Sequence, residues 1–199
     1  MRAALTSLAL ALTTGLGLAP ATFAQTPPAK AAPAAPADSA CPPILQHTFA
    51  RLQDEKPQSL CQYAGKVVLV VNTASFCGFT PQYKGLEELD RNYRDKGLVV
   101  LGFPSNDFAQ ESGSNKEIAD FCESTFGVKF PMFVKSSVRG SDANPLFKEL
   151  AKQTGTTPKW NFYKYLIARD GKVVDAYSSM TSPDDKAFVQ TIESQLRIN

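Results

Sequence analysis

The stretch GKVVLVVNTASFCGFTPQY, residues 65–83, contains a strand, a loop and the start of a helix in direct succession. Its run VVLVVNT, residues 67–73, is rich in β-branched side chains and lacks polar alternation, which is typical of a strand buried on both faces. The loop ASFCGFTP follows, and apolar residues then recur at helical spacing until Gly97, namely Tyr83, Leu86, Leu89 and Tyr93. The order predicts a strand–loop–helix unit with Cys77 in its loop.

The rest of the chain continues this alternation of strands and helices. Residues 98–103 read as a second buried strand. We further expect a helix over 115–125, a short strand over 130–134, a helix over 144–153, a hairpin made by 162–168 and 172–177, and a helix that starts at Ser182. Strands separated by helices form parallel sheets, and a hairpin adds antiparallel strands. The pattern predicts an α/β fold with a central mixed sheet flanked by helices.

The loops that follow the first two strands hold Cys77 and Gln110. Because the carboxyl ends of neighbouring parallel strands meet at one edge of a sheet, these loops should lie side by side above it. Sites of α/β proteins usually occupy that edge. We therefore expect the functional site there.

The first forty residues are not expected to belong to the folded domain. Residues 1–24 read as a secretory signal peptide, since Arg2 precedes a short apolar run and the small residues Thr22 and Ala24 precede a cleavage point. A membrane anchor is the alternative, but the run is short, contains Thr and Gly, and is closed by Pro20. We expect export to the periplasm or the exterior, without stable membrane association.

Residues 25–40, QTPPAKAAPAAPADSA, have too few apolar side chains to form a core, so they read as a linker. Residues 41–199 remain as one folded domain, which is long enough for a single core. The whole chain of 199 residues carries a formal net charge of +2. This near-neutral balance gives no electrostatic signature of nucleic-acid binding.

The four cysteines occupy different contexts in the sequence. Cys77 follows a buried strand and precedes a helix, whose first amides favour negative charge and therefore a reactive thiolate. Its loop is polar and open, which argues against an inert buried thiol. Cys41 and Cys61 could form a disulfide after export, or either could be an ordinary buried thiol. The helical spacing around Cys122 indicates a core residue, and a role as partner thiol to Cys77 requires local unwinding of that helix.

Four segments together resemble the cysteine-containing form of the glutathione peroxidase family: residues 65–83, LGFPSNDFAQE at 101–111, FGVKFPMF at 126–133, and WNFYKYLI at 160–167. The resemblance spans about Leu60 to Ile198. It implies a thioredoxin-like fold, consistent with the predicted order of elements. It also implies a thiol-dependent peroxidase that reduces hydrogen peroxide and organic hydroperoxides.

The same resemblance implies roles for individual residues. Cys77 would be the peroxidatic residue and would pass through a sulfenic acid. Gln110, Trp160 and Asn161 match the other catalytic residues of the family, and each carries an N–H donor that can stabilise a thiolate or orient a peroxide. Cys122 is the candidate resolving cysteine, with a Cys77–Cys122 disulfide expected under peroxide.

No metal or other cofactor is expected, because His47 is the only histidine and has no ligand-type companions at suitable spacing. The resemblance implies an external thiol reductant, either a thioredoxin-like protein or glutathione. Tetrameric relatives carry longer insertions before the tryptophan, so a monomer is expected here.

Two alternative functions remain. One is a thiol–disulfide oxidoreductase, although Cys77 to Thr80 is C-x-x-T without a second cysteine. The other is a binding protein that has lost turnover.

Overall fold

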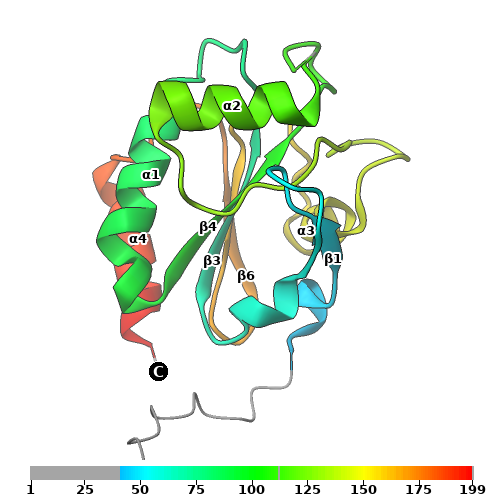
Figure 1. Cartoon of the computed structure of the whole chain (residues 1–199). Helices are drawn as coiled ribbons and strands as arrows, with labels where there is room; N and C mark the ends of the chain where they lie inside the picture. The colour runs from blue at the N-terminus through cyan, green and yellow to red at the C-terminus, as the bar shows by residue number, and fades with distance from the viewer. Residues whose placement is uncertain (1–40, 112, 199) are drawn as a thin grey trace, which may run out of the picture. The chain divides into compact units, whose positions relative to one another are not determined.

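The computed structural model describes residues 41–111 and 113–198 (Figure 1). The predicted signal peptide, 1–24, and linker, 25–40, lie outside the described residues. A four-stranded sheet has the order β4-β3-β5-β6, and its strands are β3 (Val67–Thr73), β4 (Leu98–Pro104), β5 (Lys164–Ile167) and β6 (Val173–Tyr177). β3 is parallel to β4 and antiparallel to β5, which is antiparallel to β6. The predicted mixed α/β sheet is therefore confirmed.

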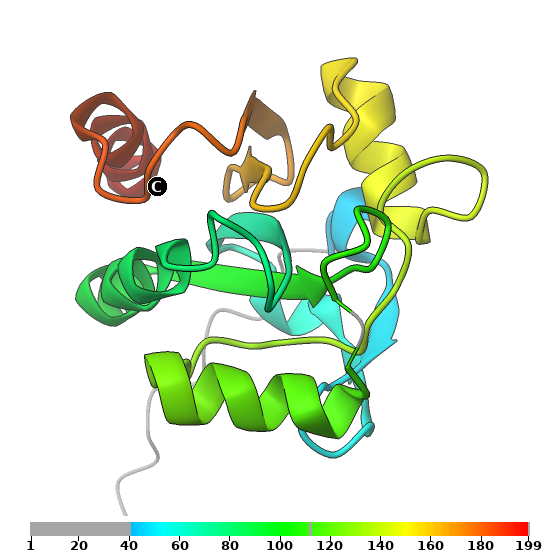
Figure 2. The same ribbon diagram turned by 90° about the horizontal axis from the view of Figure 1, so that it is seen from above.

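The two faces of the sheet are covered by different helices. α1 (Gln82–Tyr93), α2 (Asn115–Phe126) and α4 (Lys186–Arg197) share a core with Val67, Leu69 and Val71 of β3. The 3₁₀ helices η1 (Pro43–Leu45) and η2 (Leu60–Tyr63) and the helix α3 (Pro145–Thr154) share a second core with Val68 and Val70. Figures 1 and 2 show α1 and α4 on one side of the sheet and α3 on the other. Alternate β3 side chains enter opposite cores, which explains the unbroken apolar run.

The helix boundaries follow local capping chemistry. Ser114 and Glu117 form a capping box at the start of α2, and Gly127 ends this helix with a left-handed φ of 64°. The last helix begins at Lys186 and not at Ser182, so that expectation was wrong. Asp185 is its N-cap, and the side chain accepts a hydrogen bond from the Phe188 amide at 2.9 Å.

Two short pieces of sheet differ from the expectation. The predicted strand over 130–134 makes only isolated bridges, from Met132 to Gly102 and from Phe133 to Arg51. Pro131 within it has no amide to donate to a ladder. In addition, β1 (Thr48–Ala50) and β2 (Pro57–Ser59) form a small antiparallel hairpin that was not predicted. Its strands are too short and polar to show a period of two.

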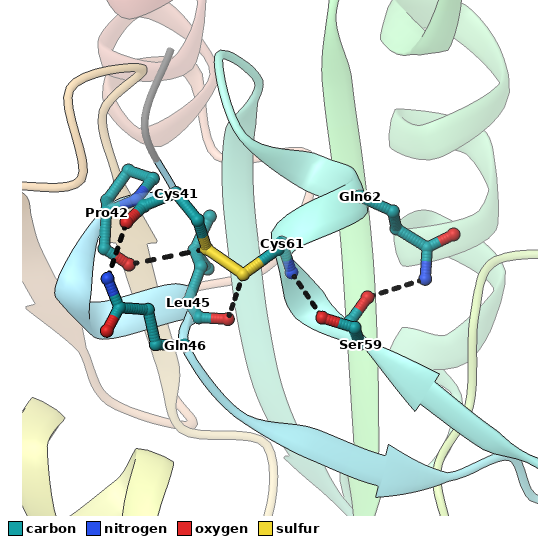
Figure 3. Close-up of a disulfide and its surroundings, with 7 residues drawn as sticks. All are labelled: Cys41, Pro42, Leu45, Gln46, Ser59, Cys61 and Gln62. Atoms are coloured by element: carbon teal, nitrogen blue, oxygen red, sulfur yellow. Dashed lines mark hydrogen bonds between the residues drawn. A yellow bond between two sulfur atoms is a disulfide. The ribbon is translucent and has the colours of Figure 1, made fainter. Parts of the chain in front are cut away.

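Cys41 and Cys61 form a disulfide that ties the start of the described chain to η2 (Figure 3). Around it, the Gln46 side chain donates to the Cys41 carbonyl at 2.8 Å, and the Cys61 amide donates to the Ser59 hydroxyl at 3.3 Å. The bridge closes the segment that contains η1, β1, β2 and the start of η2. No helix within 41–111 and 113–198 has the length and apolar content needed to cross a membrane.

Candidate active site

Cys77 lies in the turn that follows the carboxyl end of β3, and its thiol is free. The Phe79 amide donates a hydrogen bond to its sulfur at 3.4 Å. Residues 78–81 separate Cys77 from α1, so this turn amide, and not the first turn of the helix, faces the sulfur. The sulfur therefore has a backbone donor within its own turn.

The fold of this turn depends on Thr80. Its hydroxyl accepts a hydrogen bond from the Cys77 amide at 3.0 Å and donates to the Ala74 carbonyl at 2.9 Å. Thr80 is buried, and its own amide donates to the Cys77 carbonyl at 3.0 Å. The threonine of the C-x-x-T sequence therefore fixes the backbone around Cys77, at the position where a dithiol motif would carry its second cysteine.

The loop after β4 lies beside the Cys77 turn, as expected from the parallel pairing of the two strands. The Phe76 amide donates to the Gln110 carbonyl at 3.1 Å. The Asn161 side chain donates to the Gln110 side-chain oxygen at 2.9 Å. The structure thus brings together two of the predicted site residues, Gln110 and Asn161, next to the turn that holds Cys77.

Ala109, which precedes Gln110, has a left-handed φ of 57°. This conformation is unusual for a residue with a Cβ. The Asn106 side chain closes the loop around it by accepting a hydrogen bond from the Glu111 amide at 2.9 Å. Gln110 therefore lies in a tight turn that this hydrogen bond closes.

Trp160 is 40% exposed, and its ring lies against that of Phe108 with centroids 5.4 Å apart. Its backbone is anchored by Asn72, whose side chain donates to the Trp160 carbonyl at 3.0 Å and accepts from the Tyr163 amide at 3.0 Å. Among the described residues, the hydrogen bond to the Cys77 sulfur comes from Phe79, and none comes from Gln110, Trp160 or Asn161. Their predicted approach to the sulfur therefore stays a prediction.

Cys122 is a buried free thiol in α2 and belongs to the same core as Cys77. Burial raises the pKa of Cys122 to about 11, and the nearby carboxylate of Glu111 acts in the same direction. In this folded arrangement Cys122 is therefore protonated at neutral pH, unlike a thiol poised for attack. The helical context predicted from spacing is confirmed.

Three buried polar residues near the site were not identified from the sequence. Asn72 anchors the Trp160 turn, as described above. Lys164, on β5, donates from Nζ to the Gln82 side chain at 2.7 Å and to the Phe162 carbonyl at 2.8 Å, and burial lowers its pKa to about 7. Glu111 accepts a hydrogen bond from Ser75 at 3.0 Å. A polar residue inside an otherwise buried strand, as at Asn72 and Lys164, was the available signal.

No group of three or more histidine, cysteine or carboxylate side chains that could hold a metal ion occurs in the part of the chain that the structure describes. The arrangement consists of a free thiol with a backbone amide on its sulfur, and of two amide side chains on adjoining loops. Such a site supports nucleophilic chemistry at sulfur.

The fold and this thiol define a cysteine-dependent oxidoreductase with a thioredoxin-like architecture. A family model for glutathione peroxidase matches residues 45–151. The chain is 51% identical to a glutathione peroxidase of Lactococcus lactis over 64% of its own length and 84% of that protein. It is 48% identical to a hydroperoxy fatty acid reductase of Synechocystis over 67% and 86% of the two chains. The chain belongs to the glutathione peroxidase family, and it is a peroxidase-type enzyme.

Solved structures agree with this assignment. The crystal structure of Trgpx in its apo form superposes with a TM-score of 0.62 at 37% identity, covering 78% of this chain and 96% of the other. A thiol:disulfide interchange protein of the thioredoxin family from Chlorobium tepidum superposes with a TM-score of 0.60 at 17% identity, covering 80% and 99% of the two chains. At that identity the second match concerns the fold alone, and it confirms the thioredoxin-like architecture.

Proposed function

We propose that this enzyme reduces hydrogen peroxide and organic hydroperoxides with the Cys77 thiolate as the nucleophile. The supporting observation is a free thiol at the carboxyl end of β3, with the Phe79 amide on its sulfur and the paired Gln110 and Asn161 side chains on the adjoining loops. The sulfur attacks one peroxide oxygen, the O–O bond breaks, and water or an alcohol leaves. Cys77 is then a sulfenic acid.

Gln110, Trp160 and Asn161 are proposed to orient the peroxide and to stabilise charge on the sulfur and the leaving oxygen. Each supplies an N–H donor, and donors fixed before the reaction stabilise developing charge most effectively. The Gln110–Asn161 hydrogen bond at 2.9 Å supports this role, because it holds two of the three side chains together in the folded protein.

The second half of the proposed cycle uses Cys122 as the resolving thiol. Its sulfur attacks the Cys77 sulfenic acid, a disulfide forms, and the hydroxyl leaves as water with the thiol proton. Cys122 is buried in α2, and its carbonyl accepts hydrogen bonds from the Gly127 and Val128 amides. Resolution therefore requires local unwinding of α2.

A thioredoxin-like protein is proposed as the external reductant, with glutathione as the second candidate. Exposed apolar side chains near the Cys77 turn, Phe76 at 66% and Met180 at 79%, suit contact with a protein partner. Glutathione is anionic, and Arg139 and Lys159 line an open hollow of about 610 Å³, which Pro158 and Tyr163 also line.

We further propose that the enzyme is an exported monomer, with a signal peptide over 1–24, a linker over 25–40 and the enzymatic domain over 41–199.

Peroxide consumption by the full chain tests the reaction and the reductant together. Wild-type protein is mixed with hydrogen peroxide or an alkyl hydroperoxide, and thioredoxin with its reductase, or glutathione with its reductase, is supplied in separate assays. We expect turnover with thioredoxin and loss of turnover in Cys77→Ser. In parallel, mass spectrometry after one equivalent of peroxide should detect a Cys77–Cys122 disulfide.

The other outcomes separate the competing functions. Disulfide reduction without peroxide consumption would favour a thiol–disulfide oxidoreductase. No reaction of either kind would favour a binding protein on the same fold. Turnover with glutathione alone would replace the proposed reductant, and Cys77 found only over-oxidised or glutathionylated would contradict the role of Cys122.

A further inference from the structure

Lys164 is a buried lysine at the start of β5, where it pairs with Val71 near the carboxyl end of β3. Lysine is almost never fully buried unless it is paired with a charge. None of the ion pairs in the part of the chain that the structure describes includes Lys164. Its Nζ donates instead to two neutral oxygens, the Gln82 side-chain oxygen at 2.7 Å and the Phe162 carbonyl at 2.8 Å. Burial of an ammonium group among neutral partners costs folding free energy, so its place in the fold calls for an explanation.

The first contact of Lys164 leads to the Cys77 turn. Gln82 is the first residue of α1, and its side chain is fixed from a second side because its nitrogen donates to the Ser179 carbonyl at 2.7 Å. The Gln82 backbone amide donates to the Phe79 carbonyl at 2.9 Å. Phe79 is the residue whose own amide donates to the Cys77 sulfur at 3.4 Å. Hydrogen bonds through Gln82 and Phe79 therefore connect Lys164 with this sulfur.

The second contact of Lys164 leads to Asn161. Phe162 follows Asn161 in the chain and has a left-handed φ of 64°, which is a conformation that bulky residues rarely adopt. Its carbonyl accepts from Lys164, and its amide donates to the Asn72 carbonyl at 2.7 Å. The Asn161 carbonyl accepts from the buried Ser179 hydroxyl at 2.5 Å. A strained backbone persists only where the surrounding contacts hold it, so Lys164 helps to hold the turn that carries the Asn161 side chain.

We propose that Lys164 is a positioning residue for peroxide attack: its hydrogen bonds hold the Cys77 turn and the Asn161 turn in one fixed relation. This inference rests on the proposed function of Cys77 and Asn161. Lys164 acts through Gln82 on one side and through Phe162 on the other. Because the two turns are far apart in sequence, a group bonded to both sets the distance between the sulfur and the side chains that orient the peroxide. A displacement of about 1 Å in such a site can slow a reaction by about a hundredfold.

The test is a stopped-flow measurement of peroxide attack on the full chain, with one equivalent of hydrogen peroxide, no reductant, and loss of the Cys77 thiol as the signal. Lys164→Met keeps the length of the side chain but removes both hydrogen bonds, and we expect attack to slow by about tenfold. Trp160 is the only tryptophan in the chain, and it precedes Asn161 directly. Its emission maximum in the folded variant should move to longer wavelength, because a loosened turn lets its ring leave Phe108.

Arg169→Met is the matched control. Arg169 is also a cation that donates to backbone carbonyls, but it lies at the opposite end of β3, where it donates to the Gly65 carbonyl at 2.8 Å. This variant should lose stability and keep the wild-type rate of attack and the wild-type emission of Trp160. An equal loss of rate in Arg169→Met would assign the effect to general destabilisation and would overturn the inference.

Gln82→Met is an independent variant that removes the contact toward the Cys77 turn, and it should also slow attack. A wild-type rate and emission in Lys164→Met would overturn the inference alone, as would a wild-type rate in Gln82→Met if Lys164→Met does not fold. A wild-type protein whose Cys77 does not react with peroxide would overturn the proposed function together with it.

Discussion

The two ends of β3 hold cysteines in opposite bonding states. Before the strand, Cys61 in η2 is joined covalently to Cys41. After the strand, Cys77 is a free thiol, and hydrogen bonds through Thr80 fix its turn. The difference shows how one chain can contain a disulfide that joins two segments and, at the end proposed to be reactive, a buried free thiol whose turn is held by neighbouring polar side chains.

Removal of the disulfide should give the largest change in stability without a change in chemistry. In Cys41→Ala/Cys61→Ala we expect the free energy of unfolding to fall by about 3 kcal/mol, because the unfolded chain regains loop entropy. Denaturant titration measures this value, and stopped-flow kinetics should show an unchanged rate of peroxide attack. A parallel fall in that rate would break the comparison, since it would show that the two ends of β3 are coupled.

Asn72→Ala should affect stability and chemistry together, because Asn72 is at the reactive end of β3 and anchors the Trp160 turn. Two backbone groups, the Trp160 carbonyl and the Tyr163 amide, would lose their partner. We expect a loss of about 2 kcal/mol in the free energy of unfolding and a slower peroxide attack. If the variant lost stability but kept the wild-type rate, the turn would be structural only.

Lys164 should make the reactive end of the sheet sensitive to pH. Its pKa is lowered to about 7 in the folded protein by burial, so the unfolded chain binds the extra proton between about pH 7 and the ordinary lysine value near 10.4. The free energy of unfolding should therefore rise with pH across this window, by at most about 1.4 kcal/mol per unit. Denaturant titrations at several pH values should lose this slope in Lys164→Met and keep it in Lys84→Met, which alters an exposed lysine of α1. If the free energy of unfolding still rises with pH in Lys164→Met, groups other than Lys164 cause that dependence.

Thr80→Val should give the smallest effect and sharpen the view that hydrogen bonds hold the Cys77 turn. Valine keeps the shape of the side chain but removes the hydroxyl that bonds the Cys77 amide and the Ala74 carbonyl. We expect a loss of about 1 kcal/mol in stability, measured by thermal or chemical unfolding. Faster alkylation of Cys77 by iodoacetamide should accompany it, as the turn opens more often. Unchanged stability and alkylation would mean that the neighbouring loop alone holds the turn.

The sequence was sufficient to place the strand whose two faces are both buried. The run 67–73 coincides with β3 because both of its faces are buried. The start of α4 was placed too early because Ser182 and Pro183 resemble a helix start, whereas residues 182–185 form a turn before the Asp185 cap. Local pattern alone did not show that the chain makes one more turn before the helix begins.

The sequence supplied candidate residues for the site but not their contacts. Cys77 was recognisable because strand, loop and helix adjoin it in the chain. The Gln110–Asn161 hydrogen bond joins residues far apart in sequence, so it depends on the packing of β5 against β3. The partners of Asn72, the Trp160 carbonyl and the Tyr163 amide, are likewise defined by tertiary structure.

The bridge between Cys41 and Cys61 also has a mechanical consequence. A pulling force applied through the segment that precedes Cys41 enters the domain at a covalent bond and passes through it to η2 and the amino end of β3. Residues 42–60, which include η1, β1 and β2, are bypassed by that force and are not peeled away first. Tension is then applied to the central strand at the end opposite to the Cys77 turn. In single-molecule pulling from the amino terminus, reduction of the bridge should add the length of this bypassed segment to the unfolding extension.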